Sequence, residues 1–309
     1  MSNLIEKNKI FGFEDLFTEF KYLLTNNILP NKILISGPKG IGKYTFAIHF
    51  INYVLSANEI DKYNEKNYEI NSKNRSFNLM NNYTHPNFSL ISLKNNKKNI
   101  EIDQIRNLIY YSQKSSFNNA KRFILIDNVE LLNKNSSNAL LKLLEEPPSN
   151  LYFILIHDNL YKILDTIKSR TIIFKKNFQY NSIISISNKI IGEDFKLINN
   201  VYLNMYNSIG DLVFLSNFAK NNEIDISNLS IKELLDIMIT KKMYKKDPDQ
   251  ISLMLKLIQA LFFEYLFIAK DNKIYKLYKY FIIKINNTIK FNLDMESLFF
   301  EFQNKIINE

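Results

Sequence analysis

The segment Lys32–Leu55 reads KILISGPKGIGKYTFAIHFINYVL and decides the fold of the first half of the chain. Its first residues form a short apolar run, which is typical of a buried strand. The residues Gly37–Lys43 match the phosphate-loop pattern GxxxxGK, and the apolar residues after them recur at helical spacing. A strand, a glycine-rich turn and a helix in this order are the setting of a phosphate loop. The segment therefore predicts a nucleotide-binding type of α/β fold.

The chemistry of this loop is incomplete. Its glycines let backbone N–H groups face phosphate oxygens, and Lys43 would reach the outer phosphates. The next residue should be a Ser or Thr that holds Mg²⁺, but it is Tyr44, and Thr45 lies about 100° further around the helix. We expect weak or absent ATP binding, with a glycine-rich turn that has no nucleotide role as the alternative. The glycines concerned are Gly37, Gly40 and Gly42.

A second nucleotide motif has a matching defect. The apolar run Arg122–Asp127 ends in an acid that would order Mg²⁺, and active ATPases place a Glu next to it as the base for the attacking water. Here that residue is Asn128, whose amide cannot accept a proton. Glu130 follows two residues later, and we expect it to be a solvated residue at a helix start. Together with Tyr44, Asn128 predicts a chain without ATP hydrolysis.

The rest of the first half alternates strand and helix patterns, which predicts a parallel sheet covered by helices on both faces. The expected strands are Asn87–Leu93, Arg122–Asp127, Tyr152–Ile156 and Thr171–Phe174, and the expected helices are Lys43–Leu55, Glu101–Lys114 and Ser136–Glu146. The polar, aperiodic segment Ser56–Asn82 is expected to be a poorly ordered connection or an irregular insertion. After Lys175 the pattern is helical, with expected helices at Ile231–Met243, Asp249–Ala269, Ile274–Lys290 and Met295–Ile307.

Composition excludes several classes of protein. The chain of 309 residues has no Cys, which excludes disulfides and thiolate metal sites, and its 3 His are far apart. No apolar run approaches the roughly 20 residues of a membrane span, and the first residues do not resemble a signal sequence, so we expect a cytoplasmic protein. The net charge of +9 suits a polyanion partner, but Lys is abundant throughout, so charge alone does not indicate DNA binding.

The segment Ser137–Pro148, SNALLKLLEEPP, resembles the NALLKxLEEPP segment of bacterial clamp-loader subunits, which are AAA+ proteins. Thr166–Thr171 resembles their TIxSRC motif, with Thr171 where Cys is usual. His85–Asn87 resembles their His-Pro-Asp, and Ile102–Arg106 resembles their IDQIR helix start. The resemblance covers roughly residues 10–175. Many of these relatives carry a four-Cys zinc module before His-Pro-Asp, and a chain without Cys must do without that zinc.

The resemblance implies three domains: a RecA-like AAA+ domain over 1–175, a small helical lid over 176–221 and an all-α collar over 222–309 that mediates oligomerisation. The damaged nucleotide motifs favour the non-hydrolysing delta-prime type within the DNA polymerase III holoenzyme, with no intrinsic catalysis and no required cofactor. The implied partners are the gamma or tau ATPases, delta, primer–template DNA and, indirectly, the sliding clamp. The alternatives are an active gamma/tau-type ATPase and an AAA+ adaptor outside replication.

The resemblance also assigns individual residues. Arg170, with Ser169 before it, occupies the position of an arginine finger presented in trans to the ATP of a neighbouring subunit. The plainer alternative is an arginine that caps a strand or pairs with a carboxylate. Arg106 and Lys134 stand near helix starts that line the DNA-facing side of the ring in relatives, so they are candidates for contacts with the DNA backbone, or else solvated surface charges.

Overall fold

The computed structural model describes residues 8–94, 97–113, 120–148, 150–205, 208–245, 248–269 and 272–308. The chain forms two compact units, Met1–Ile186 and Ser187–Glu309. The first unit contains the predicted sheet and the second is helical. The division of the helical part into a lid and a collar stays a prediction.

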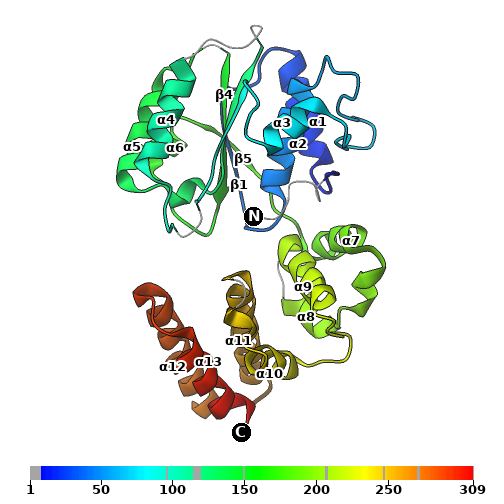
Figure 1. Cartoon of the computed structure of the whole chain (residues 1–309), viewed down its shortest axis with the longest axis vertical. Coiled ribbons are helices and arrows are strands. Elements are labelled where there is room, and N and C mark those ends of the chain that lie inside the picture. The colour runs from blue at the N-terminus through cyan, green and yellow to red at the C-terminus, as the bar shows by residue number, and fades with distance from the viewer. Residues whose placement is uncertain are drawn as a thin grey trace. The chain divides into compact units, whose positions relative to one another are not determined.

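The first unit is a parallel five-stranded sheet in the order β2-β3-β4-β1-β5, with helices on both faces (Figure 1). This confirms the predicted α/β fold. Helices α1, α2 and α3 cover one face, and α4, α5 and α6 cover the other. The strands are β1 (Lys32–Gly37), β2 (Phe88–Ile91), β3 (Arg122–Ile126), β4 (Leu151–Asp158) and β5 (Ile172–Lys175). The helices are α1 (Glu14–Thr25), α2 (Lys43–Leu55), α3 (Arg75–Asn81), α4 (Ile102–Gln113), α5 (Lys134–Glu145) and α6 (Asp165–Lys168).

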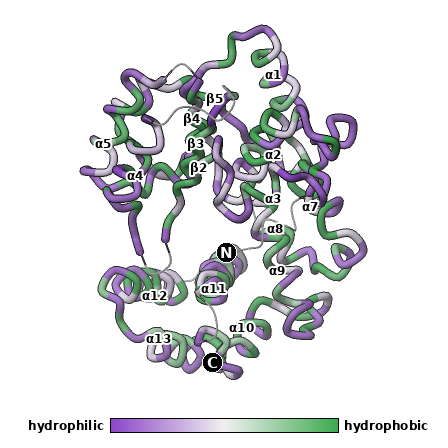
Figure 2. The backbone as a smooth tube through the Cα atoms, turned by 45° about the horizontal axis from the view of Figure 1, so that its top comes forward, coloured by the Kyte–Doolittle hydropathy of each residue, from purple (hydrophilic) through white to green (hydrophobic). Residues whose placement is uncertain are grey.

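The central strands are apolar on both faces because both faces are covered. Every residue of β3 is buried, as are all but one residue each of β1 and β4. Figure 2 shows these strands as hydrophobic stretches inside a largely hydrophilic periphery. The edge strand β5 differs, because its first residues Ile172 and Ile173 are 55% and 39% exposed. This edge of the sheet therefore presents apolar surface to solvent.

An aromatic cluster fixes α1 and α2 against the sheet. Phe46 of α2 stacks on Phe13 with ring centroids 5.2 Å apart, and Phe20 of α1 meets Phe174 of β5 edge-on at 4.7 Å. All of these rings except Phe174 are fully buried. The helix that follows the phosphate loop is therefore held by a rigid core that also reaches the edge strand.

The segment Ser56–Asn82 is ordered, so the first of the two expectations, a poorly ordered connection, is wrong, while an irregular insertion agrees with its turns and single short helix. The carboxylate of Glu59 accepts hydrogen bonds from the backbone N–H groups of Arg75 (3.1 Å) and Ser76 (3.0 Å) at the start of α3. The Ser76 hydroxyl also donates to Glu59 (2.5 Å) and lies 3.3 Å from Nε2 of His85. Hydrogen bonds and burial in the core of α1 and α2 thus order a segment whose sequence shows no periodicity. The apolar side chains that join this core are Tyr63, Ile70, Phe77 and Met80.

The second unit confirms the helices expected near the end of the chain. Within this unit, Asp211 and Lys256 form an ion pair of 2.5 Å. Within the described part of the chain, no helix combines the length and the apolar character that crossing a membrane requires. The helices from the end of the first unit onward are α7 (Tyr180–Ile191), α8 (Asn200–Met205), α9 (Ile209–Asn221), α10 (Ile231–Thr240), α11 (Pro248–Ala269), α12 (Asn272–Phe291) and α13 (Met295–Phe302).

Candidate functional site

The phosphate loop has the predicted backbone form. It leaves β1 at Gly37 and enters α2 at Lys43. Gly40 and Gly42 have φ angles of 79° and 100°, a left-handed conformation that side chains with a Cβ adopt rarely. Gly42 is the N-cap of α2, so the glycine pattern sets the turn that starts the helix.

The lysine of the loop is bound by the loop itself. Lys43 is only 5% exposed, and its Nζ donates to the carbonyl oxygens of Gly37 (2.6 Å) and Pro38 (2.5 Å). Burial lowers the pKa of Lys43, while the nearby carboxylates of Asp158, Glu130 and Asp127 act in the opposite direction. The ammonium group therefore lies inside the loop, among backbone carbonyls and acids. The sequence pattern indicated that Lys43 could reach a phosphate, but not that its Nζ donates to carbonyl oxygens of its own loop.

The second nucleotide motif ends in Asp127 as predicted, but the environment of Glu130 differs from the prediction. Asp127 follows the last residue of β3, and Asn128 has a φ of 56°, which Asn tolerates better than most residues. Glu130 is half-buried, and its Oε2 accepts a hydrogen bond of 3.2 Å from the backbone N–H of Asp158. Glu130 does lie at the start of a short helix, as expected, but the expectation that it is solvated is wrong, because a strand far away in sequence supplies a hydrogen-bond donor.

Tyr44 occupies the position where a phosphate loop places its Mg²⁺ hydroxyl. It packs against the aromatic core, and its burial, with the charge of Asp127 and the neighbouring Tyr83, raises the pKa of its phenol well above the usual value. Tyr44 therefore stays neutral and mostly apolar in character. Thr45 lies half-buried in the first turn of α2.

The end of β4 contributes a buried histidine. Nε2 of His157 lies 2.9 Å from the carbonyl oxygen of Tyr161, so this nitrogen carries a proton. Nδ1 of His157 lies 3.0 Å from the hydroxyl of Ser36 on β1. His157 thus ties the neighbouring strands β1 and β4 together beside the loop. Within the part of the chain that the structure describes, no group of three or more His, Cys, Asp or Glu side chains is arranged to hold a metal ion.

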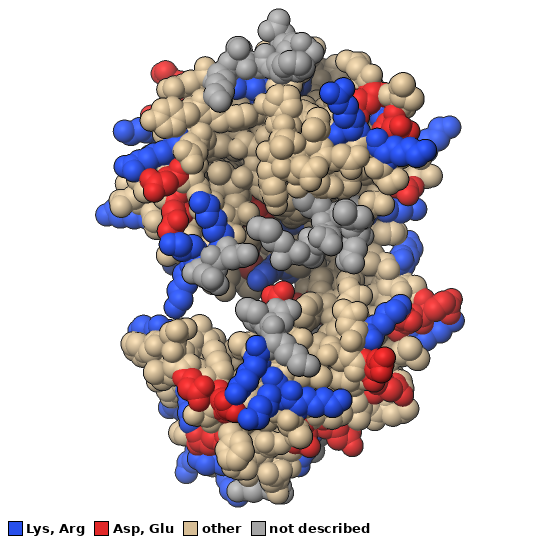
Figure 3. Space-filling model, viewed as in Figure 1, with Lys and Arg blue, Asp and Glu red and all other residues tan. Residues whose placement is uncertain are grey.

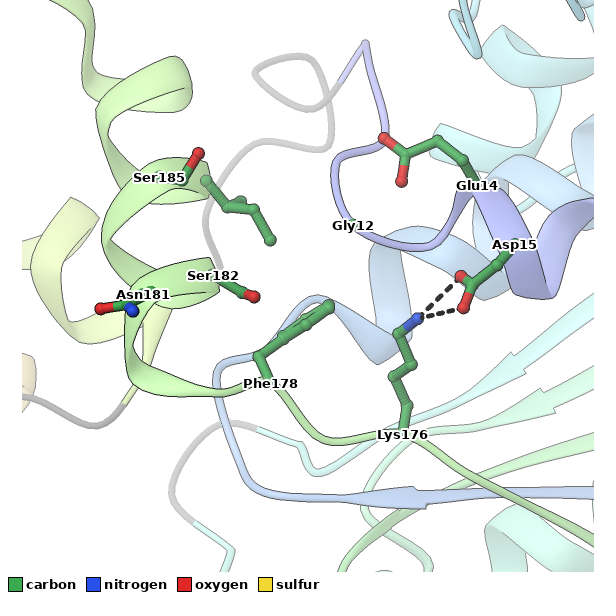
Figure 4. A pocket seen from close by; sticks show the side chains of 9 residues that line it. Gly12, Glu14, Asp15, Lys176, Phe178, Asn181, Ser182 and Ser185 are labelled. Atoms are coloured by element: carbon green, nitrogen blue, oxygen red, sulfur yellow. Dashed lines mark hydrogen bonds and ion pairs between the residues drawn. The ribbon is translucent and has the colours of Figure 1, made fainter.

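A cavity of about 650 Å³ lies beside the loop, between the turn at Gly12 and the first turns of α7 (Figure 4). Nζ of Lys176 donates to both carboxylate oxygens of Asp15, at 2.7 and 2.9 Å. The ring of Phe178 and the side chain of Ile186 reach over Gly12, where an added Cβ would lie 2.6 Å from Ile186. Lys176 and Asp15 are therefore paired with each other, and apolar side chains cover the turn at Gly12.

Arg170 lies just before β5, at the end of the sheet opposite the phosphate loop. It follows α6, and its guanidinium donates to the carbonyl oxygen of Thr166 (3.2 Å) and to the carboxylate of Glu145 (2.9 Å). The side chain is one-third exposed. The Ser169 hydroxyl also donates to Thr166 (3.2 Å). Thr171, at the expected Cys position, is buried and donates to the carbonyl of Ile167 (3.0 Å).

Strand register separates Arg170 from the phosphate loop. The first residue of β5, Ile172, is in register with Ile33 near the start of β1. The loop begins four residues further along β1, at Gly37, which is about 13 Å at roughly 3.3 Å per residue. Glu145, the partner of Arg170, is the last residue of α5, just before β4 begins. Arg170 therefore lies at the amino ends of the parallel strands, and the phosphate loop lies at their carboxyl ends.

The two candidates for DNA contacts lie on adjacent helices. Arg106 is exposed on α4 and pairs with Asp103 at 3.0 Å, and Lys134 is the first residue of α5. The Ser136 hydroxyl donates to the carbonyl of Ile100 (2.8 Å), which ties the starts of the two helices together. Basic and acidic side chains are interspersed on the face that Figure 3 shows, so no single basic surface stands out there.

The comparison with protein families gives a match over more than half of the chain. The model of a family described as DNA polymerase III, delta subunit, matches residues 12–179. The chain belongs to this family. It is thus a member of the AAA+ clamp-loader proteins of DNA polymerase III, as the LEEPP and SRT segments predicted.

Curated relatives carry two different subunit names. The chain is 32% identical over 177 residues to a DNA polymerase III subunit gamma of Buchnera aphidicola, covering 52% of this chain and 48% of that protein. It is 30% identical over 139 residues to a subunit delta' of Pseudomonas aeruginosa, covering 45% and 40%. The chain thus spans about half the length of the curated relatives it matches. A gamma-subunit-related structure from Thermotoga maritima has a TM-score of 0.43 at 16% identity, covering 86% of this chain and 76% of that one.

Proposed function

We propose that this chain is a non-hydrolysing clamp-loader subunit of the delta-prime type, which completes the ring that loads the sliding clamp and supplies Arg170 in trans. The observation that carries the proposal is the separation of Arg170 from the chain's own phosphate loop. An arginine at the opposite edge of the sheet cannot act on a nucleotide in that loop. It can act on a nucleotide held by a neighbouring subunit.

The contacts of Arg170 suit this role. Its ion pair with Glu145 is exposed to solvent, and such pairs contribute only about 0–1 kcal/mol. Arg170 can therefore exchange the carboxylate for a phosphate without a large loss. A guanidinium placed at the γ-phosphate neutralises charge that develops in the transition state. Ser169 and Arg170 both donate to the carbonyl oxygen of Thr166, which anchors the two side chains to the same turn.

The surroundings of Arg170 also suit a subunit interface. Ile172 and Ile173, which follow the buried Thr171, are exposed. In the helical unit Phe262 and Phe281 fill the core, while other large apolar side chains remain exposed. These surfaces would pack against the gamma or tau and delta subunits in a cytoplasmic complex. Exposed apolar residues of the helical unit include Phe263, Tyr275, Ile283, Phe291 and Phe300.

The chain's own nucleotide site has lost the groups that hydrolysis needs. Tyr44 replaces the Mg²⁺-binding hydroxyl, and Asn128 replaces the general base. In this role the chain needs no ATP and no zinc of its own. Arg106 and Lys134 would contact the phosphates of primer–template DNA, which gives position without reading bases.

An active ATPase of the gamma or tau type is the alternative, because curated relatives with that name match about as well. Steady-state ATPase measurements on the full-length isolated chain separate the two. We expect no turnover above a Lys43→Ala control, with or without DNA. Turnover that Lys43→Ala abolishes would establish the ATPase alternative. Co-purification from cell extract should bring down clamp-loader subunits, and their absence would contradict the ring role.

A further inference from the structure

One ammonium group and three carboxylates meet where β1 and β4 end side by side. Gly37, the last residue of β1, is in register with Asp158, the last residue of β4. Asp158 is 4% exposed, and Glu130 accepts a hydrogen bond from its backbone N–H. The carboxylates of Asp158, Glu130 and Asp127 all lie close enough to Lys43 to favour its charged form. The carboxylates therefore outnumber the ammonium group three to one.

We propose that Lys43 is a structural cation that closes the phosphate loop on itself, and that Asp158 and Glu130 make the loop reject polyphosphates. In a phosphate loop the lysine and the helix N-terminus attract anions. Here the ammonium already binds the carbonyls of Gly37 and Pro38, and an entering phosphate would also meet the carboxylates beside it. In a site shielded from water, like charges repel more strongly than they do in solution.

This inference goes beyond the lack of hydrolysis. Tyr44 and Asn128 remove a metal ligand and a base, but the backbone N–H groups that hold phosphates do not depend on either side chain. Asp158 and Glu130, by contrast, act on the phosphates directly. Loss of hydrolysis would thus follow from Tyr44 and Asn128. Loss of ATP binding would follow from Glu130 and Asp158.

The first experiment measures ATP affinity of the full-length chain by calorimetry, with and without Mg²⁺. The wild-type chain should show no saturable binding at millimolar ATP. The variant Glu130→Gln/Asp158→Asn should show saturable binding, with a Kd at least about 10-fold below the lower limit that the wild type sets, which corresponds to at least about 1.4 kcal/mol. The matched control Tyr44→Thr/Asn128→Glu should bind no better than the wild type. Tight binding by the wild type, or no gain in the folded neutralised variant, would overturn the proposal.

The second experiment tests the structural role of Lys43 without a substitution. Acetylation with an amine-reactive reagent, followed by mass spectrometry, compares Lys43 with Lys39, which is exposed in the same loop. Lys43 should react much more slowly than Lys39 in the folded chain and at the same rate in urea. Equal rates in the folded chain would show that Lys43 is not held by the loop. Neither experiment involves a neighbouring subunit, so failure here leaves the role of Arg170 untouched.

Discussion

The two ends of the parallel strands differ in how their basic residues are buried and bonded. At the carboxyl edge, where β1 ends, Lys43 is 5% exposed and bonded to the loop's own carbonyls. At the amino edge, Arg170 is one-third exposed, and its side-chain partner is an exposed carboxylate. The first edge is closed and engaged with itself. The second is open and available to a partner.

The two ends of the sheet depend on the same interior. Both rest on the same two apolar cores, which fill the faces of the sheet. The proposed loss of hydrolysis at the phosphate loop would therefore leave Arg170 in place.

The largest effect should come from the core that both edges share. Phe46 is fully buried between Phe13, Phe17 and Phe20. Phe46→Ala leaves a cavity, and such changes cost about 3–5 kcal/mol. Denaturant unfolding should show this loss, together with weaker incorporation into the clamp-loader complex. A loss below about 1 kcal/mol, the usual range of surface changes, would mean that the edges do not depend on this core.

A smaller effect should come from the ordered segment that replaces the expected loop. Glu59→Gln keeps the shape of the side chain but removes the charge that binds the first N–H groups of α3. We expect a loss of about 1–2 kcal/mol in denaturant unfolding, because these are charge-assisted bonds at a helix start. The ATPase rate of the assembled complex should not change, since neither edge is touched.

A matched control for this change lies in the same segment. Glu65 forms an exposed ion pair with Lys21. Glu65→Gln should change the free energy of unfolding by less than about 0.5 kcal/mol, as exposed pairs usually do. Equal effects of Glu59→Gln and Glu65→Gln would show that the carboxylate of Glu59 does not order the segment.

The smallest effect should depend on pH. Burial alone would raise the pKa of Asp15, but its hydrogen bond from Lys176, with a backbone bond and the charge of Lys176, lowers that pKa overall. A carboxyl with a lowered pKa stabilises the fold above its unfolded pKa of about 3.9 and loses this contribution as the pH falls through the folded pKa. Lys176→Met should therefore lower the melting temperature at pH 7, and the difference from wild type should shrink below about pH 4.

The size of this last effect is limited by exposure. The Asp15 side chain is 75% exposed, so the pair should contribute no more than about 1 kcal/mol. Lys196→Met, which breaks the fully solvated pair with Glu193, is the control and should have no measurable effect at either pH. A difference for Lys176→Met that stays constant down to pH 2 would mean that its packing on Phe13 and Phe178, not its charge, stabilises this edge.

The sequence predicted the sheet because its signals are local. The apolar run of β1 and the glycines before Lys43 fix a strand, a turn and a helix within a short segment, and α2 has the predicted bounds. The edge strand β5 and the end of α5 were also placed within about two residues, since prolines and apolar runs mark them.

The remaining features depend on partners far away in sequence. Glu59 binds N–H groups at Arg75 and Ser76, and Glu130 binds the N–H of Asp158, so no short pattern marks either acid. The charged form of Lys43 is likewise favoured by acids at the ends of β3 and β4, which are far away in sequence. The position of Arg170 at the edge opposite the loop follows from strand register, which only the folded chain provides.

The most direct test of the account is the DNA- and clamp-stimulated ATPase of the reconstituted complex with wild-type or Arg170→Ala protein. An arginine finger in trans can be worth ~10³ or more in rate at the site it serves, so total turnover should fall in part and clamp loading should fall further. Lys168→Ala, which removes an exposed cation on the same short helix α6, is the control and should leave both rates unchanged. Equal rates for Arg170→Ala and wild type, with equal assembly by gel filtration, would contradict the account and make Arg170 a structural residue.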